Sequence, residues 1–322
     1  AAQHYESGWV AMEKKDYTTA VNEFQQVIDQ NSRLAESYRA EGIAYYSEKA
    51  YPEAIAAFSR SLNNMDDPDK EFKKDVQFYL AQARMDYGEV DKAIEVYSEI
   101  LKAGEDEQAF FLRGKAYISM EDYKNAEKDF QRALEGCEDY NLYINIYQIY
   151  VDHNKAVDGD AYLKMALELE PQDGEDCYHR GRIYEYEKNY EAARDELKTA
   201  MEQGYEDAML LLGRVYLEME DPASARSMYQ EYLQKSEQGA KAYNGLAMCD
   251  IYDGAYDSAL ENIAQGLKEN SKEDEQGLLY NEIVAYEYKR DFATAKEKMK
   301  IYLEQYPEDE AALRENEFLS TR

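Results

Sequence analysis

The residues that could bind a metal are few and lie far apart along this chain. They are three histidines and three cysteines: His4, His153, His179, Cys137, Cys177 and Cys249. His179 follows Cys177 by two residues, a spacing that turns the two side chains to different sides of a helix. The spacing of the cysteines fits neither a zinc site nor a disulfide framework. We therefore predict no metal site here and interpret the cysteines as small buried apolar residues.

One acidic stretch has the residue types of a calcium-binding loop. Its oxygen-bearing side chains are Asp152, Asn154, Asp158 and Asp160. An EF-hand that begins at Asp152 needs a ligand oxygen at the fifth position, glycine at the sixth and glutamate at the twelfth. The sequence places there Ala156, Val157 and Leu163. The EF-hand motif therefore fails, and a loose surface cation site is the remaining alternative.

The sequence contains no motif for catalysis. It has no glycine-rich phosphate loop and no paired histidine–glutamate zinc motif. Carboxylate pairs are no evidence for acid–base catalysis, because 68 of the residues are Asp or Glu. We predict a protein that is not an enzyme and needs no cofactor, with an enzyme whose site is unrecognised as the remote alternative.

Charge narrows the classes of partner. The chain has 37 basic and 68 acidic residues, for a formal net charge of −31. Such a surface repels phosphate backbones and anionic lipid headgroups, so we expect neither nucleic acid nor a charged membrane surface as a partner. No apolar run is long enough to span a membrane. The acidic surface either keeps a long molecule soluble or attracts a basic partner.

A pattern of small and aromatic residues recurs along the whole chain. Its first copy consists of Gly8, Tyr17, Ala20, Phe24 and Val27. Clear later copies begin at Gly42, Gly114, Gly181 and Gly213, and weaker copies lie between and after them. The weakest copy, from 140 to 171, has Tyr147 and Gly159 where small residues are usual. We count nine repeats with periods of about 32 to 39 residues.

Each unit contains two amphipathic stretches joined by a turn, which predicts a pair of helices. In the first unit they lie near residues 3–15 and 18–30. Polar residues suited to capping stand before the second helix, at Asp16, Asp122, Asn189, Asp221 and Asp291. We place the repeats at residues 1–34, 35–68, 74–106, 107–139, 140–173, 174–205, 206–239, 240–275 and 276–309. A C-terminal capping helix at 310–322 would cover the last repeat with Ala312, Leu313 and Phe318.

This pattern resembles that of the tetratricopeptide repeat family, and the resemblance covers almost the whole chain. It implies an all-α fold: an α-α superhelix, or solenoid, of about nine helix-turn-helix repeats with a short capping helix. It also implies that the first helix of each pair lines a concave groove in which partner peptides lie.

Carried over residue by residue, the resemblance implies a groove lining. Its members include Tyr5, Trp9, Arg39, Tyr46, Phe78, Phe111, Lys115, Tyr178, Arg182, Leu210, Arg214, Leu217, Asn244, Met248 and Tyr280. Some members of the family clamp the carboxylate of a chaperone tail with lysines, asparagines and an arginine. The matching places hold Tyr5, Trp9, Ala40, Phe78 and Gln82, so we predict that the clamp is absent.

Two parts of this lining have open alternatives. We expect the aromatic side chains of the N-terminal half to be exposed, with Trp9 acting either as a binding anchor or as a cover for the first repeat. Arg182 and Arg214 occupy matching places in adjacent repeats, near His179. They either receive a partner's carboxylate or pair with glutamates such as Glu185.

Two irregularities interrupt the period. The insertion NNMDDPD, residues 63–69, predicts an exposed turn between the second and third repeats. The stretch VDHNKAVDGDAY, residues 151–162, predicts a loop in the fifth repeat that is either a hinge or the result of sequence drift.

The sequence therefore predicts a non-enzymatic scaffold that binds a protein or peptide segment in its groove. The alternative is a self-associating structural component of an envelope or secretion assembly. The chain begins Ala1-Ala2-Gln3, without methionine, and both an exported lipoprotein and a cytoplasmic adaptor fit it.

Overall fold

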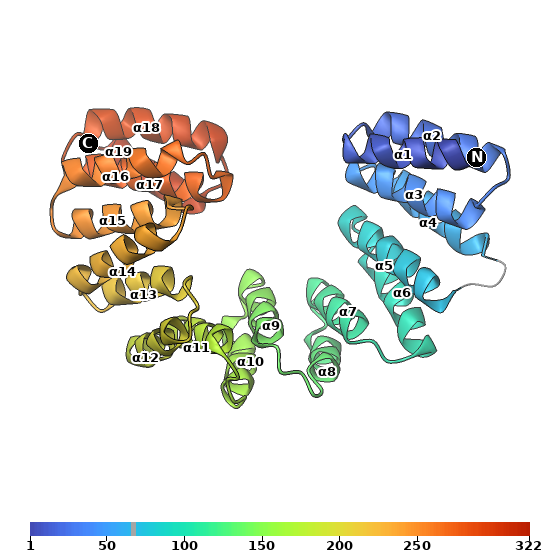
Figure 1. The fold of residues 1–322 in the computed structure, drawn as a ribbon, viewed down its shortest axis with the longest axis horizontal. Coiled ribbons are helices and arrows are strands. Elements are labelled where there is room, and N and C mark those ends of the chain that lie inside the picture. Colours follow the sequence, from blue (N-terminus) through green and yellow to red (C-terminus); the bar gives the residue numbers. More distant parts are fainter. Residues whose placement is uncertain (66–68) are drawn as a thin grey trace. The chain divides into compact units, whose positions relative to one another are not determined.

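The computed structural model describes residues 1–65 and 69–322, and over these residues the chain forms nineteen helices and no strand (Figure 1). The predicted all-α class and repeated helical architecture are confirmed. The turn predicted at 63–69 falls partly outside the described residues. The chain divides into two units, residues 1–162 and 163–322, and each is described by itself.

Unit 1 contains nine complete helices and the start of a tenth. They are α1 (Ala2–Glu13), α2 (Tyr17–Asp29), α3 (Leu34–Ser47), α4 (Tyr51–Asn63), α5 (Lys70–Tyr87), α6 (Val90–Ala103), α7 (Glu107–Ser119), α8 (Tyr123–Ala133), α9 (Tyr140–Asp152) and α10 (Ala156–Leu167). From α1 to α8, each helix packs against the next one in the sequence.

Unit 2 begins within α10 and continues the same alternation. Its helices are α11 (Gly174–Tyr186), α12 (Tyr190–Glu202), α13 (Ala208–Glu218), α14 (Pro222–Lys235), α15 (Ala240–Tyr252), α16 (Tyr256–Lys268), α17 (Lys272–Tyr288), α18 (Phe292–Gln305) and α19 (Glu310–Ser320). Each packs against the next, and the odd-numbered helices α11, α13, α15 and α17 also contact one another in order. The exact bounds of the nine repeats stay a prediction.

The polar caps predicted from the sequence all form. Asp16, Asp122, Asn189, Asp221 and Asp291 each accept a hydrogen bond from the backbone amide three residues later. These bonds satisfy amides that the first turn of a helix leaves without partners. In each of these five turns, the residue before the cap has a positive φ between 58° and 63°. The turn between paired helices is therefore fixed by backbone geometry and capping together.

The small residues of the repeat lie where paired helices cross. A Cβ on Gly8 would lie 2.5 Å from Phe24, and a Cβ on Gly114 would lie 2.7 Å from Phe130. Both phenylalanine rings are fully buried. Glycine therefore permits an approach that any larger residue would prevent, and the aromatic ring fills the space between the helices.

The fifth repeat packs differently at this crossing. Tyr147 on α9 stands where the other repeats have glycine or alanine, and Gly159 on α10, in the place of Ala20, faces it. A Cβ on Gly159 would lie 3.1 Å from Cδ2 of Tyr147 and 3.0 Å from Cβ of Tyr150. The long loop predicted over 151–162 is wrong, because only residues 153–155 lie between α9 and α10. Asp158 and Asp160 are therefore helical and not part of a calcium-type loop.

The predicted C-terminal cap is α19, but its covering residues differ in part. Ala312 and Leu319 are buried, and they pack with Ile283, Met299 and Tyr302. The prediction for Leu313 and Phe318 is wrong, since they are 43% and 42% exposed. Ala312 and Leu319 are seven residues apart, which puts them two turns apart on one helix face.

A carboxyl pair near this cap predicts pH-dependent stability. Burial, followed by the charge of Glu315 on α19, raises the pKa of Glu287 on α17 to about 7. Because the folded-state pKa lies above the unfolded value, the protonated carboxyl favours folding. That contribution is complete below the unfolded pKa and is lost as the pH rises through about 7. Tyr280 lies close enough to feel the charges of Glu287, Glu315, Asp309 and Arg314.

We expect the melting temperature of the wild type to fall between about pH 4.5 and about pH 7 and to level off above that. Glu287→Gln should remove most of this dependence, because an amide does not titrate. Thermal melts followed by circular dichroism at several pH values measure the difference. Parallel pH profiles for the two proteins would contradict the assignment to Glu287.

Candidate partner-binding groove

A groove with a volume of about 1010 Å³ lies on unit 2. The odd-numbered helices α11, α13, α15 and α17 provide most of its surface, and α14 contributes two tyrosines. Its lining residues are Tyr178, Asp207, Leu210, Leu211, Arg214, Leu217, Glu218, Tyr229, Tyr232, Gln238, Ala240, Lys241, Asn244, Gly245, Met248, Glu269, Ser271, Glu273, Asp274 and Asn281. Among the residues predicted from the sequence, the structure brings together here Tyr178, Leu210, Arg214, Leu217, Asn244 and Met248.

The apolar part of the groove comes from helix periodicity. Leu210 and Leu217 are seven residues apart on α13, so they lie on the same face. Both are half-buried, and Met248 on α15 is 36% exposed. A methionine side chain is flexible and polarizable, so it adapts to differently shaped apolar partners. These three residues give the groove apolar area that water still reaches.

Two asparagines provide a polar centre. Nδ2 of Asn281 on α17 donates a hydrogen bond to Oδ1 of Asn244 on α15, at 2.8 Å. Both side chains are half-buried. This bond uses one donor and one acceptor, and each amide has further capacity for hydrogen bonds. Asn281 was absent from the predicted lining, because the sequence pattern assigns Tyr280 to that place on α17.

The cations in the groove already have carboxylate partners. Arg214 donates two hydrogen bonds to Glu185, at 2.6 and 2.7 Å. Lys241 donates to Glu273 at 2.9 Å, and this bond raises the pKa of Lys241 and lowers that of Glu273. Of the two alternatives for Arg214, the structure has the ion pair with Glu185.

Arg182 is not among the residues that line the groove. Its Nη1 lies 3.2 Å from Nδ1 of His179, and its guanidinium lies 6.0 Å from the ring centre of Tyr178. His179 is itself buried. Arg182 is consequently engaged with its own helix, α11.

The predicted aromatic residues of unit 1 are half-buried, so each ring is only partly open to water and partly used in packing. Tyr5 and Trp9 each pack edge-on against Phe24, at ring distances of 5.8 and 5.6 Å. Phe78 and Phe111 pack at tilted angles against Tyr97 and Phe130, at ring distances of 6.3 and 6.1 Å. An aromatic ring on the first helix fills the space beside the buried ring of the second helix. Much of the area counted as a binding surface is therefore used in packing.

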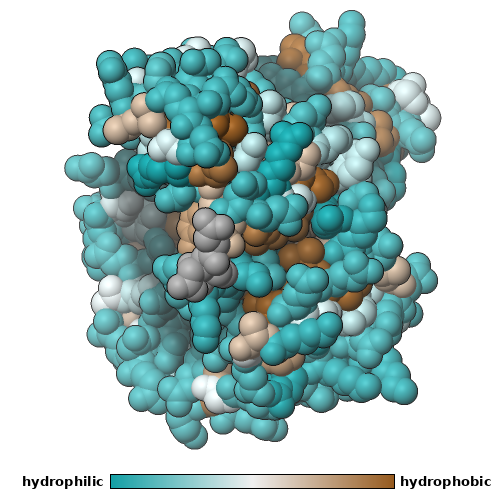
Figure 2. Space-filling model, turned by 90° about the vertical axis from the view of Figure 1, so that its right-hand side faces the viewer, coloured by the Kyte–Doolittle hydropathy of each residue, from teal (hydrophilic) through white to brown (hydrophobic). Residues whose placement is uncertain are grey.

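The polar members of the prediction in unit 1 have mixed surroundings. Arg39 forms an ion pair with Asp75, and the Tyr46 hydroxyl donates to Asp86. Lys115 is exposed on α7. The face of the molecule in Figure 2 is mainly hydrophilic, with hydrophobic residues in small areas interrupted by polar ones. In unit 2, Tyr280 packs against Tyr302 and lies outside the groove lining.

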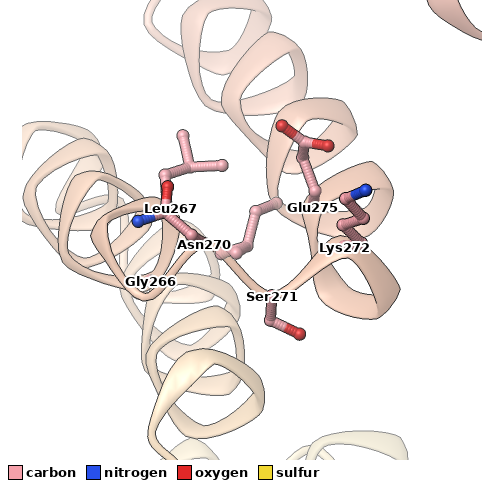
Figure 3. A pocket seen from close by; sticks show the side chains of 7 residues that line it. Gly266, Leu267, Asn270, Ser271, Lys272 and Glu275 are labelled. Carbon is pink, nitrogen blue, oxygen red and sulfur yellow. The ribbon is translucent and has the colours of Figure 1, made fainter. Parts of the chain in front are cut away.

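A smaller pocket of about 180 Å³ lies at the connection between α16 and α17. Lys272 and Glu275 extend from the first turn of α17, while Leu267 and Asn270 lie across from them (Figure 3). Ser271 lines both this pocket and the groove. The small pocket is therefore a side space next to the groove.

Within residues 1–65 and 69–322, no group of three His, Cys, Asp or Glu side chains is placed to hold a metal ion. Across the same ranges, no helix has the length and apolarity needed to cross a bilayer.

Comparison with known proteins identifies the repeat. One family model, described as tetratricopeptide repeat, matches residues 5–69, 178–240 and 210–275, which together make up half of the chain. A second model with the same description matches residues 107–139. No sequence among the curated proteins matches the chain.

One solved structure, that of yeast Tom70, supports the same fold. Yeast Tom70 is 15% identical, with a TM-score of 0.52, over 94% of this chain and 77% of that one. A tetratricopeptide repeat protein from Parabacteroides merdae is 16% identical, with a TM-score of 0.47, over 87% of this chain and 98% of that one. YrrB, described as a TPR protein with an unusual peptide-binding site, is 26% identical, with a TM-score of 0.38, over 58% and 97%.

Proposed function

We propose that this chain, which belongs to the tetratricopeptide repeat family, holds a segment of a partner protein in the groove of unit 2. Members of this family act as protein-interaction scaffolds. The observation that carries this proposal is the combination of water-accessible apolar side chains with hydrogen-bonding amides in one groove. Leu217 and Met248 supply the first, and Asn244 and Asn281 supply the second.

The size and openness of the groove favour a polypeptide over a small molecule. Pockets for small ligands measure about 300–1,000 Å³ and enclose most of the ligand. This groove is at the upper limit of that range and runs across the surfaces of four helices. An extended or helical peptide gains affinity from a few apolar anchors, while backbone hydrogen bonds fix its position.

Self-association is the weaker alternative. A second copy of the chain would bring another net charge of −31 to a groove that is itself rich in carboxylates. Light scattering over a concentration series tests this alternative directly, since a strict monomer excludes it.

The double substitution Leu217→Ala with Met248→Ala tests the proposal. We expect this variant to lose a partner protein that the wild type retains in cross-linked affinity captures, because both apolar anchors are removed. Ile301→Ala is the matched control: it truncates an apolar side chain that is 50% exposed on α18, outside the groove. Trp9→Ala with Phe111→Ala examines the predicted surface of unit 1 in the same assay. Identical partner sets for the groove variant and the control would argue against the groove.

A further inference from the structure

Building on the proposed function, we infer that the groove of unit 2 selects a positively charged segment, one that carries lysine or arginine next to an apolar side chain. The observation is the charge of the lining. Its carboxylates are Asp207, Glu218, Glu269, Glu273 and Asp274, and its cations are Arg214 and Lys241. Carboxylates thus outnumber cations by five to two.

The two cations are poorly placed to receive an acidic partner. Arg214 is bound bidentately by Glu185, which is 14% exposed. Lys241 is bound by Glu273 at 2.9 Å and lies 4.0 Å from Asp274. A partner carboxylate would have to displace a carboxylate already in place, so it would gain little.

Carboxylates remain available to a cation. Asp207 is exposed at the start of α13, and its side chain makes no capping hydrogen bond. Glu218 is exposed at the end of α13 and accepts one hydrogen bond at 3.2 Å, from the Tyr190 hydroxyl. A carboxylate oxygen pair accepts about four hydrogen bonds, so both groups can take a lysine or arginine head without breaking an ion pair.

The apolar surface suits the same segment. The aliphatic stem of lysine or arginine packs along apolar area while its head stays at the polar rim. Leu210, in the first turn of α13, offers such area near Asp207. Leu217 and Met248, which also line the groove, can contact the apolar side chain that stands next to the lysine or arginine in the bound segment.

Other occupants conflict with this charge. Nucleic acid and anionic lipid are repelled by the carboxylates, and a second copy brings a net charge of −31. A basic segment is attracted over longer distance and then held by contact.

A phage-displayed library of random peptides tests the inference. Selection is made on the intact wild-type chain, and binders that also bind Leu217→Ala with Met248→Ala are removed. We expect the groove-dependent binders to be enriched in lysine or arginine and in large apolar residues. Enrichment of aspartate or glutamate would overturn the charge inference and leave the proposed function standing. Absence of any groove-dependent binder would count against both.

A carboxylate-neutralised variant checks the mechanism with the most enriched peptide. Asp207→Asn with Glu218→Gln should weaken its binding about tenfold and flatten its dependence on salt, because both exposed carboxylates lose their charge. The control Glu261→Gln with Glu297→Gln removes the same charge at exposed positions outside the groove and should bind like the wild type. Equal weakening in both variants would mean that only net charge matters, which would overturn the inference.

Discussion

Gly245→Ala should lower the free energy of unfolding of unit 2 by about 1–3 kcal/mol, since overpacking a filled core has a cost of that size. A Cβ on Gly245 would lie 2.3 Å from Cζ of Tyr229. A Cβ on Gly213 would approach the same ring to 2.5 Å. Tyr229 is 4% exposed and is held between the two glycines, so its ring can move only towards the groove that it lines. The extra methyl must therefore displace this ring from its buried position or push α13 and α15 apart.

Gly277→Ala is the matched control for this prediction. It lies inside α17, and a Cβ there would meet nothing closer than Nδ2 of Asn244, at 3.4 Å. Alanine is favoured over glycine within a helix by about 0.5–1 kcal/mol, so this variant should be as stable as the wild type or more stable. Adding Tyr229→Leu to Gly245→Ala should restore part of the loss. Urea unfolding followed by circular dichroism compares the variants, and equal stability of Gly245→Ala and Gly277→Ala would refute the packing argument.

The predicted parts of the fold are those that depend on contacts within one repeat. Gly8 and Phe24 are sixteen residues apart, and Gly114 and Phe130 keep that spacing. Because the contact partner lies at a fixed sequence distance, the period reveals both the helix pair and its crossing. The fifth repeat hid this relation, because Tyr147 stands in the glycine place and the residue sixteen positions later is Leu163, which is not aromatic.

The groove could be predicted only in part, because its charge depends on ion pairs between residues of different repeats. Position in the repeat identified Arg214 and Asn244 as lining residues. The partner of Arg214 is Glu185, 29 residues earlier, and many acidic residues of this chain lie at comparable distances. Asp207 was missed because it precedes the helix from which the lining was assigned. A sequence in which 68 residues are acidic cannot show which carboxylates are paired and which are open.

Asp250→Ala should lower the free energy of unfolding by about 3 kcal/mol, within the range for removing one partner from a buried ion pair or hydrogen-bond network. Asp250 on α15 is buried. Its Oδ1 accepts a hydrogen bond from Arg226 on α14 at 2.7 Å. Its Oδ2 accepts from Ser258 and Asn262 on α16, at 2.7 and 2.8 Å. One carboxylate thus joins three successive helices, and its removal leaves three donors without this acceptor.

Asp253, a second carboxylate partner of Arg226, provides the control. Arg226 also donates to Asp253 at 2.9 Å, but the side chain of Asp253 is 46% exposed. Asp253→Ala should therefore cost less than about 1 kcal/mol, as is usual for ion pairs in water. Urea unfolding of both variants, together with amide exchange across α14–α16, measures the contrast. If both variants lose the same free energy of unfolding, only the charge of Arg226 matters. A larger loss for Asp250→Ala, with faster amide exchange in all three helices, would show that the buried carboxylate links the repeats.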